Sequence, residues 1–171
     1  RSILIDIGGG SVELTLSEGT KIKASESFPL GTVRLIEALE AHGLKEKHLS
    51  EVINQSFRPA RAFLKDAIKG KKIDFAIGTG GNFECLGKLR VALLSKTSIY
   101  SMTQSELKEL TDHLASMSVK ERIHYLRLRE DRADVVVPAA LVTLAVMQAI
   151  PTELLQIPFV GLREGILASL A

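Results

Sequence analysis

The chain has a single cysteine and little excess charge, and each shortage excludes a class of protein. One cysteine, Cys85, cannot form an internal disulfide, and no cysteine and histidine cluster has the spacing of a zinc site. This composition favours a reducing compartment, so we expect a cytoplasmic protein. A formal net charge of +2 is too small to indicate nucleic-acid binding by itself, and we expect no nucleic-acid partner.

Long apolar runs are also lacking. The most apolar segment, 135–150, has only 16 residues and contains Pro138 and Gln148, whereas a helix that spans a bilayer needs about 20 apolar residues. We therefore expect a buried helix there and no membrane partner. No secretory signal is recognisable at the start, and the absence of an initial methionine indicates a fragment.

The remaining composition is that of one folded domain. The 171 residues are 46% hydrophobic and 25% charged, with five prolines, and contain no repeat, linker or low-complexity tract. This length is sufficient to bury a substantial core. We therefore treat 1–171 as a single domain.

The first 28 residues have the pattern of strands and turns. Residues 3–7 are apolar apart from Asp6, residues 12–16 alternate with a period of two, and 21–28 is a third candidate strand. Glycine-rich or polar turns separate the three segments. The pattern predicts a cluster of β-hairpins at the N-terminus.

Helical spacing begins at Thr32 and dominates the rest of the chain. Pro59 either kinks the second helix or starts a new segment. The full set consists of predicted helices at 32–42, 49–69, 80–94, 104–115, 119–126, 131–149 and 162–170, with short strands at 73–77 and 157–160. Strands in a hairpin cluster, then strands alternating with helices, predict an α/β fold with a mixed sheet and flanking helices.

The stretch DIGGGSVEL joins the first two strands through Gly8, Gly9 and Gly10. Because a strand follows these glycines, the loop is not a dinucleotide-binding turn, and it lacks the Gly-Lys-Ser/Thr of a P-loop. Taken alone, three glycines are typical of a tight hairpin turn. They also let backbone N–H groups approach an anion and adopt positive φ without steric cost, and Ser11 can add a hydroxyl donor.

Two carboxylates accompany this loop. Asp6 lies at the end of the first strand, and Glu13 lies two residues past Ser11 on the same face of the next strand. A carboxylate beside a phosphate is repelled unless a cation or a water stands between them. Asp6 therefore fits a Mg²⁺ ligand, and Glu13 fits a base that positions water.

A second glycine loop, GTGGN at 78–82, follows another predicted strand and opens a helix. N–H groups and the helix dipole favour an anion at such a position. Two loops at the ends of two strands of one sheet are expected to face the same cleft. The second loop makes a phosphate cradle the better interpretation of the first.

Five motifs together resemble the exopolyphosphatase and guanosine pentaphosphate phosphatase family. The resemblance covers the whole chain and rests on DIGGGSVEL, FPLGTVRL at 28–35, GTGGN, DRADVVVPAAL at 131–141 and GLREGIL at 161–167. Val12 stands where the family often has threonine. This family belongs to the actin, Hsp70 and sugar kinase superfamily, so the resemblance implies an RNase H-like domain, the second of two that enclose a phosphate-binding cleft.

The resemblance also implies an activity and its residues. The expected reaction is Mg²⁺-dependent hydrolysis of terminal phosphate from polyphosphate or guanosine pentaphosphate. Catalysis is assigned to Glu13 and Asp6, with Asp6 as metal ligand. Phosphate binding is assigned to Gly8, Gly9, Gly10, Ser11, Gly80, Gly81 and Asn82. The first domain of the family is absent from this chain, so we expect half of a cleft, without turnover alone, and an N-terminal domain as partner.

Other interpretations stay open. The chain is alternatively half of an acetate or sugar kinase-like enzyme, or a non-catalytic nucleotide or polyphosphate sensor. Arg34 and Arg163 lie in family-like motifs and are either functional or structural. The lysines at 69, 71 and 72 are more typical of a solvated helix end than of a site. The apolar segment 135–150 belongs to the core first, and a homodimer contact is a further expectation.

Overall fold

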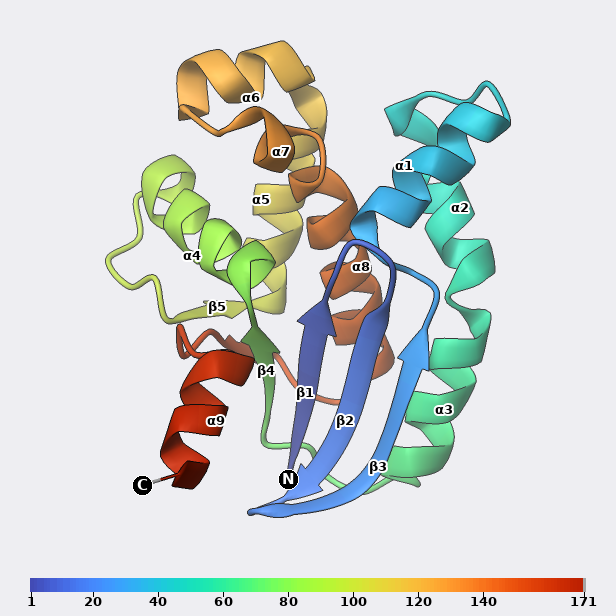
Figure 1. The fold of residues 1–171 in the computed structure, drawn as a ribbon, viewed down its shortest axis with the longest axis vertical. Coiled ribbons are helices and arrows are strands. Elements are labelled where there is room, and N and C mark those ends of the chain that lie inside the picture. The colour runs from blue at the N-terminus through green and yellow to red at the C-terminus, as the bar shows by residue number, and fades with distance from the viewer. Residues whose placement is uncertain (171) are drawn as a thin grey trace.

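The computed structural model describes residues 1–170, apart from the side chains of 162, 163 and 169. The chain forms six strands, nine α-helices and one 3₁₀ helix in this described part (Figure 1). The strands are β1 (Ser2–Ile7), β2 (Val12–Glu18), β3 (Lys21–Phe28), β4 (Phe75–Thr79), β5 (Ser101–Thr103) and β6 (Leu154–Gln156). The helices are α1 (Thr32–Ala41), η1 (Glu46–His48), α2 (Leu49–Ser56), α3 (Arg58–Ile68), α4 (Gly81–Leu94), α5 (Gln104–Ser116), α6 (Val119–Leu126), α7 (Glu130–Ala133), α8 (Val136–Ala149) and α9 (Leu162–Leu170).

The six strands make one mixed sheet in the order β3-β2-β1-β4-β6-β5. The three N-terminal strands pair antiparallel as two successive hairpins. The pairs β1–β4 and β4–β6 are parallel, and β5 closes the other edge antiparallel to β6. The predicted α/β class, mixed sheet and N-terminal hairpin cluster are confirmed.

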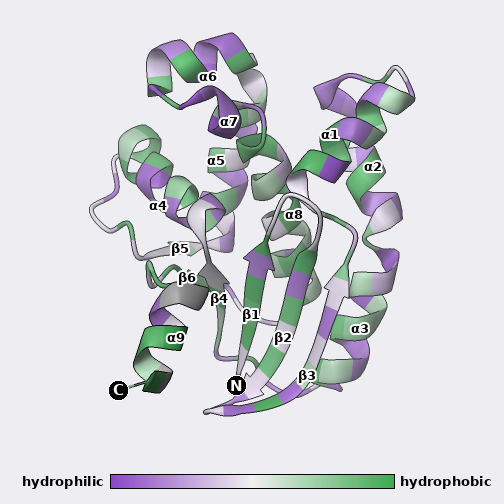
Figure 2. Ribbon diagram, viewed as in Figure 1, coloured by the Kyte–Doolittle hydropathy of each residue, from purple (hydrophilic) through white to green (hydrophobic). Residues whose placement is uncertain are grey.

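One face of the hairpin strands belongs to the core. Alternation with a period of two places Ile3, Ile5 and Ile7 on this face, and each is at most 4% exposed. On the opposite face of β1, Leu4 is half-buried and Asp6 is exposed. Figure 2 shows the same alternation of apolar and polar residues along the strands. The carboxylate of Asp6 thus lies on the side of the sheet that the main core does not occupy.

Helix α8 is the centre of the helical layer. Ten of its residues are buried, and α1, α2, α3, α4 and α5 all contact it. The segment Glu130–Ala149 has the length and apolar composition of a membrane-spanning helix, but 67% of its most apolar window is buried inside the protein. The expectation of a buried helix at 135–150 is confirmed.

Several predicted boundaries need correction. The strand expected at 157–160 is wrong, because the last strand is β6 at Leu154–Gln156. The strand expected at 73–77 begins two residues later, at Phe75. The predicted helix 131–149 is two helices. Of the two alternatives for Pro59, the start of a new segment is confirmed, because Pro59 lies in the first turn of α3.

Candidate functional site

The two glycine loops meet at one edge of the sheet. Strands β1 and β4 run parallel with Asp6 opposite Thr79, so the loops that follow them leave the sheet side by side. A Cβ atom added to Gly80 would lie 3.4 Å from Oδ1 of Asp6. The side chain of Asn82 donates from Nδ2 to the carbonyl of Ile7 at 2.7 Å and ties the start of α4 to the end of β1. The prediction that both loops face one place is thereby supported by the geometry.

The first loop, Gly8 to Ser11, is held by the N-terminus of α1. The backbone N–H of Thr32 donates to the carbonyl of Gly8 at 3.0 Å, and the N–H groups of Val33 and Arg34 donate to the carbonyl of Gly9 at 3.0 and 3.1 Å. Nε of Arg34 donates to the carbonyl of Gly10 at 3.0 Å. Three successive loop carbonyls therefore point toward α1.

This arrangement fixes where the N–H groups of the loop point. In a trans peptide the C=O and N–H bonds point in opposite directions, so the N–H groups of Gly9, Gly10 and Ser11 point away from α1. Within the described part of the chain, neither Gly9 nor Gly10 donates its N–H to another group. The loop presents backbone donors to whatever lies in front of it, as an anion cradle requires.

Glycine is not required in this loop for a positive φ angle. None of Gly8, Gly9 and Gly10 adopts a left-handed backbone, which corrects our expectation for this loop. A Cβ on Gly10 would meet no atom within 4 Å. Glycine at this position leaves open space in front of the loop and keeps the backbone accessible.

The two carboxylates stand in one row across the sheet. In the strand register, Asp6 on β1 lies opposite Glu13 on β2, and Glu13 lies opposite Ser27 on β3. Oε1 of Glu13 accepts hydrogen bonds from the hydroxyls of Ser11 at 2.6 Å and Ser27 at 2.7 Å. None of the described residues donates to Oε2. One oxygen of Glu13 is thus fixed in place while the other remains available.

The carboxyl of Asp6 is electrostatically strained. Partial burial raises its pKa above the ordinary value of 3.8, and the neighbouring carboxylate of Glu13 raises the pKa further. A divalent cation between the two groups would relieve this repulsion. Magnesium is commonly held by one or two carboxylates together with phosphate oxygens and water, so Asp6, with Glu13 nearby, fits that group.

The second loop is built by different means. Gly80 has φ of 89° and ψ of 175°, a region essentially restricted to glycine, and it is the N-cap of α4. A Cβ on Gly78 would lie 2.0 Å from the ring of Phe83, so this glycine lets the strand pack against the helix. No side chain caps α4, so the first N–H groups of the helix, from Gly81 onward, are free to face an anion.

The side chain of Asn82 has a structural task. Besides its bond to Ile7, its Oδ1 accepts from a guanidinium nitrogen of Arg132 at 3.2 Å. Asn82 therefore bridges β1 and α7, and its side chain is committed to these two contacts. The sequence motifs containing Arg132 and Asn82 gave no sign of this contact.

Sequence reasoning missed one member of the site. Ser27 donates a hydrogen bond to Glu13, but this contact could be identified only from the register of β3 against β2. Arg34 contacts the loop backbone, whereas the side chain of Arg163 lies outside the described residues. Cys85 is half-buried, and burial raises the pKa of its thiol.

Comparisons with known proteins agree with this geometry. The sequence model of the Ppx/GppA phosphatase family matches residues 1–171. Exopolyphosphatase 1 of Mycobacterium leprae is 28% identical over 174 residues, which cover 98% of this chain and 50% of that protein. The guanosine-5'-triphosphate,3'-diphosphate pyrophosphatase of Vibrio vulnificus is 24% identical over 97% of this chain and 33% of its own length.

Solved structures show the same fold. An exopolyphosphatase from Cytophaga hutchinsonii superimposes with a TM-score of 0.80 at 25% identity, covering 99% of this chain and 56% of the other. The type II variant of the Aquifex aeolicus Ppx/GppA phosphatase gives a TM-score of 0.77 at 24% identity over 98% of this chain. The chain spans about half the length of the exopolyphosphatases it matches.

The paired carboxylates and the two glycine loops therefore stand in a chain whose whole length fits one family of phosphatases, and the chain belongs to the Ppx/GppA phosphatase family.

Proposed function

We propose that this chain supplies one side of a cleft in which the terminal phosphate of polyphosphate or of guanosine pentaphosphate is hydrolysed. The observation that carries the proposal is the outward N–H row of Gly9, Gly10 and Ser11 beside the carboxylate pair of Asp6 and Glu13. The relatives named exopolyphosphatase and guanosine-5'-triphosphate,3'-diphosphate pyrophosphatase support the substrate class. The strand order supports an RNase H-like domain as the scaffold.

Each part of the site has a task in this proposal. The N–H groups of Gly9, Gly10 and Ser11 bind the oxygens of the terminal phosphate, and the N-terminus of α4 at Gly80 and Gly81 faces a neighbouring phosphate. Asp6 holds a Mg²⁺ ion, which neutralises phosphate charge when bound. Because phosphoryl transfer depends mainly on position and charge, these groups supply most of what the reaction needs.

Glu13 orients the attacking water. The hydroxyls of Ser11 and Ser27 fix Oε1, so Oε2 can accept a hydrogen bond from a water in line with the terminal phosphate. The carboxylate then receives the proton of that water as the phosphoanhydride bond breaks. A residue held by two hydrogen bonds loses little entropy on reaching this geometry.

The rest of the proposal concerns the whole protein. We propose that a preceding domain covers the loops from the other side, that the chain alone does not turn over, and that the protein acts in the cytoplasm. A homodimer is also proposed.

The test is phosphate release by the protein that contains this chain, with Mg²⁺ and either substrate. Glu13→Gln is expected to lower kcat at least about 100-fold, the usual contribution of a general base, with a smaller change in KM. Glu26→Gln is the matched control, because Glu26 is exposed on the neighbouring strand β3 and lies opposite Leu14 in the strand register, whereas Ser27 lies opposite Glu13. Unchanged turnover in Glu13→Gln would contradict the assignment, and unchanged binding without any turnover in the parent protein would favour a sensor.

A further inference from the structure

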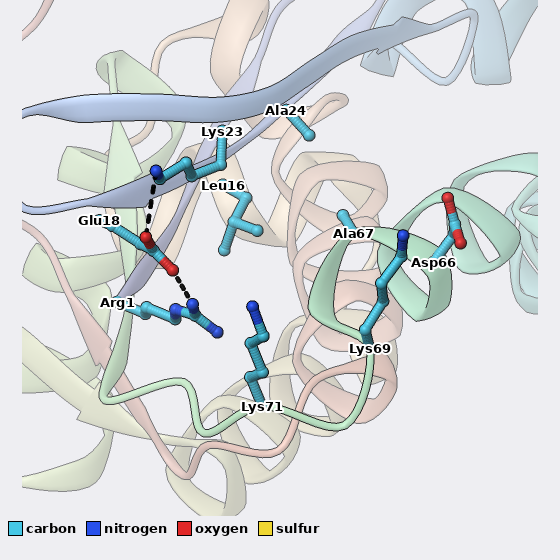
Figure 3. Close-up of a pocket in the computed structure, with 9 residues that line it drawn as sticks. All are labelled: Arg1, Leu16, Glu18, Lys23, Ala24, Asp66, Ala67, Lys69 and Lys71. Atoms are coloured by element: carbon cyan, nitrogen blue, oxygen red, sulfur yellow. Dashed lines mark ion pairs between the residues drawn. The ribbon is translucent and has the colours of Figure 1, made fainter.

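A cavity lies at the opposite end of the same strands from the glycine loops. It has a volume of about 360 Å³ and is lined by residues of β2, β3, the C-terminal end of α3 and the segment that follows α3 (Figure 3). Ligand pockets usually have volumes of about 300 to 1,000 Å³. The cavity is thus large enough for a small ligand and is separate from the carboxylate pair.

Positive charge dominates the lining. Four of the lining side chains are cationic and two are anionic; they are Arg1, Lys23, Lys69, Lys71, Glu18 and Asp66. Glu18 pairs with both Arg1 and Lys23, so these three groups keep one positive charge in excess. Lys69 and Lys71, set against Asp66, supply the other excess positive charge, and neither lysine has an ion pair among the described residues.

These two lysines line different sides of the cavity: the amine end of Lys69 is turned toward Ala67 and Asp66, and that of Lys71 toward Arg1 (Figure 3). Lys69 is the C-cap of α3 and has φ of 48°, a left-handed conformation that costs a residue other than glycine about 1 kcal/mol. Figure 3 shows the ends of Lys71 and Arg1 turned toward the same space. Cations that face one cavity repel one another unless an anion stands between them.

The sequence analysis treated this lysine cluster as a solvated helix end. The structure separates its members: Lys69 and Lys71 line the cavity, whereas the side chain of Lys72 is 85% exposed and pairs with Asp74. The electrostatic field of Glu13, beside the first glycine loop, does not account for the positions of the charged groups at the cavity. Glu18 is five residues from Glu13 along β2, or about 17 Å, which exceeds the screening length of about 10 Å at 0.1 M salt.

We propose that this cavity is a second anion site that binds a short run of linked phosphate groups. The site holds a phosphate chain away from the reacting end and needs no metal, because lysine and arginine supply the charge and the hydrogen-bond donors. The inference draws its ligand class from the proposed function, but its residues are independent of the glycine loops.

The test is a titration of the ¹⁵N-labelled chain with tripolyphosphate in the absence of metal, followed by NMR. We expect the amide signals of Ala67, Lys69 and Lys71 to shift together and to saturate. Shifts confined to Gly9, Gly10 and Ser11 would overturn the second site and leave the proposed function standing. Shifts confined to the cavity would support the second site and count against the phosphate loop.

Two neutral variants separate a built site from general attraction to a basic surface. Lys71→Gln is expected to weaken tripolyphosphate binding at the cavity about tenfold, the usual effect of removing one charged hydrogen bond. Lys72→Gln removes the same charge one residue away and is expected to change the affinity less than about twofold, as for an exposed, screened charge. Equal weakening by both variants would overturn the proposal.

A third arm identifies the source of the phosphates. GTP and tripolyphosphate present the same linked phosphates, and inorganic phosphate presents one. Tighter binding of tripolyphosphate than of GTP at the cavity signals would assign the site to polyphosphate, and the reverse would assign it to a nucleotide. Equal binding of inorganic phosphate and tripolyphosphate would overturn the claim that a run of phosphates is recognised.

Discussion

The two glycine loops of this chain meet at one edge of the sheet but are shaped by different forces. In the hairpin loop, Gly8 to Gly10 have ordinary φ angles, and α1 fixes the backbone by donating N–H hydrogen bonds to the carbonyls of Gly8 and Gly9. In the second loop, Gly80 has a backbone that only glycine adopts readily, and the helix that follows leaves its first N–H groups free. Glycine therefore provides access in the first loop and conformation in the second.

The largest expected effect concerns the contact that shapes the hairpin loop. Gly31 has φ of −65°, so alanine is not strained there, but its Cβ would lie 2.3 Å from the carbonyl oxygen of Gly9. Gly31→Ala should lower the free energy of unfolding by about 3 kcal/mol, at the upper end for overpacking, and should abolish phosphate binding at the loop. Chemical denaturation and NMR titration measure both quantities. Native stability in this variant would show that α1 does not hold the loop.

The next effect tests the second loop. Gly80→Ala places a side chain at φ of 89° and ψ of 175°, which costs about 2 kcal/mol of backbone strain. We expect a matching loss in the free energy of unfolding. Gly165→Ala is the control, because a Cβ there meets nothing within 4 Å and the position lies within a helix. A neutral Gly80→Ala would contradict the conformational role.

Sequence reasoning predicted the hairpin cluster, the α/β class and the adjacency of the loops, because each depends on local pattern and on the rule that parallel strands end at one edge. It did not predict Ser27 or the bridge from Asn82 to Arg132, since these depend on strand register and on a contact across 50 residues. It placed a strand at 157–160, three residues too late, because apolar residues continue beyond β6. Those features are decided by tertiary packing.

A smaller effect concerns the carboxylates beside the hairpin loop. The pKa of Asp6 is raised above 3.8 by partial burial and by Glu13, so Glu13→Gln should lower the pKa of Asp6 toward that value. The raised pKa means that stability from Asp6 is present below 3.8 and is lost as pH rises through the folded pKa. Glu13→Gln should reduce the amount of stability that is lost as pH rises. Titration of the Asp6 carboxyl carbon by NMR measures the shift, with Glu26→Gln as control, and a raised pKa in Glu13→Gln would contradict the account.

The smallest effect on stability is expected at Gly10. A Cβ at Gly10 meets no atom within 4 Å and no left-handed φ is involved, so Gly10→Ala should change the free energy of unfolding by less than about 0.5 kcal/mol. Phosphate binding should nevertheless weaken, because the methyl group occupies the approach to the N–H row. Unfolding and binding measured on one sample separate the two effects. Unweakened binding would argue that the anion does not approach from that side.

The most direct test of the central claim is a crystal structure of the chain soaked with tungstate, a phosphate analogue located by its anomalous scattering. The account predicts tungstate within hydrogen-bond distance of the N–H groups of Gly9, Gly10 and Ser11, on the side away from α1. Tungstate bound elsewhere, with both glycine loops empty, would contradict it.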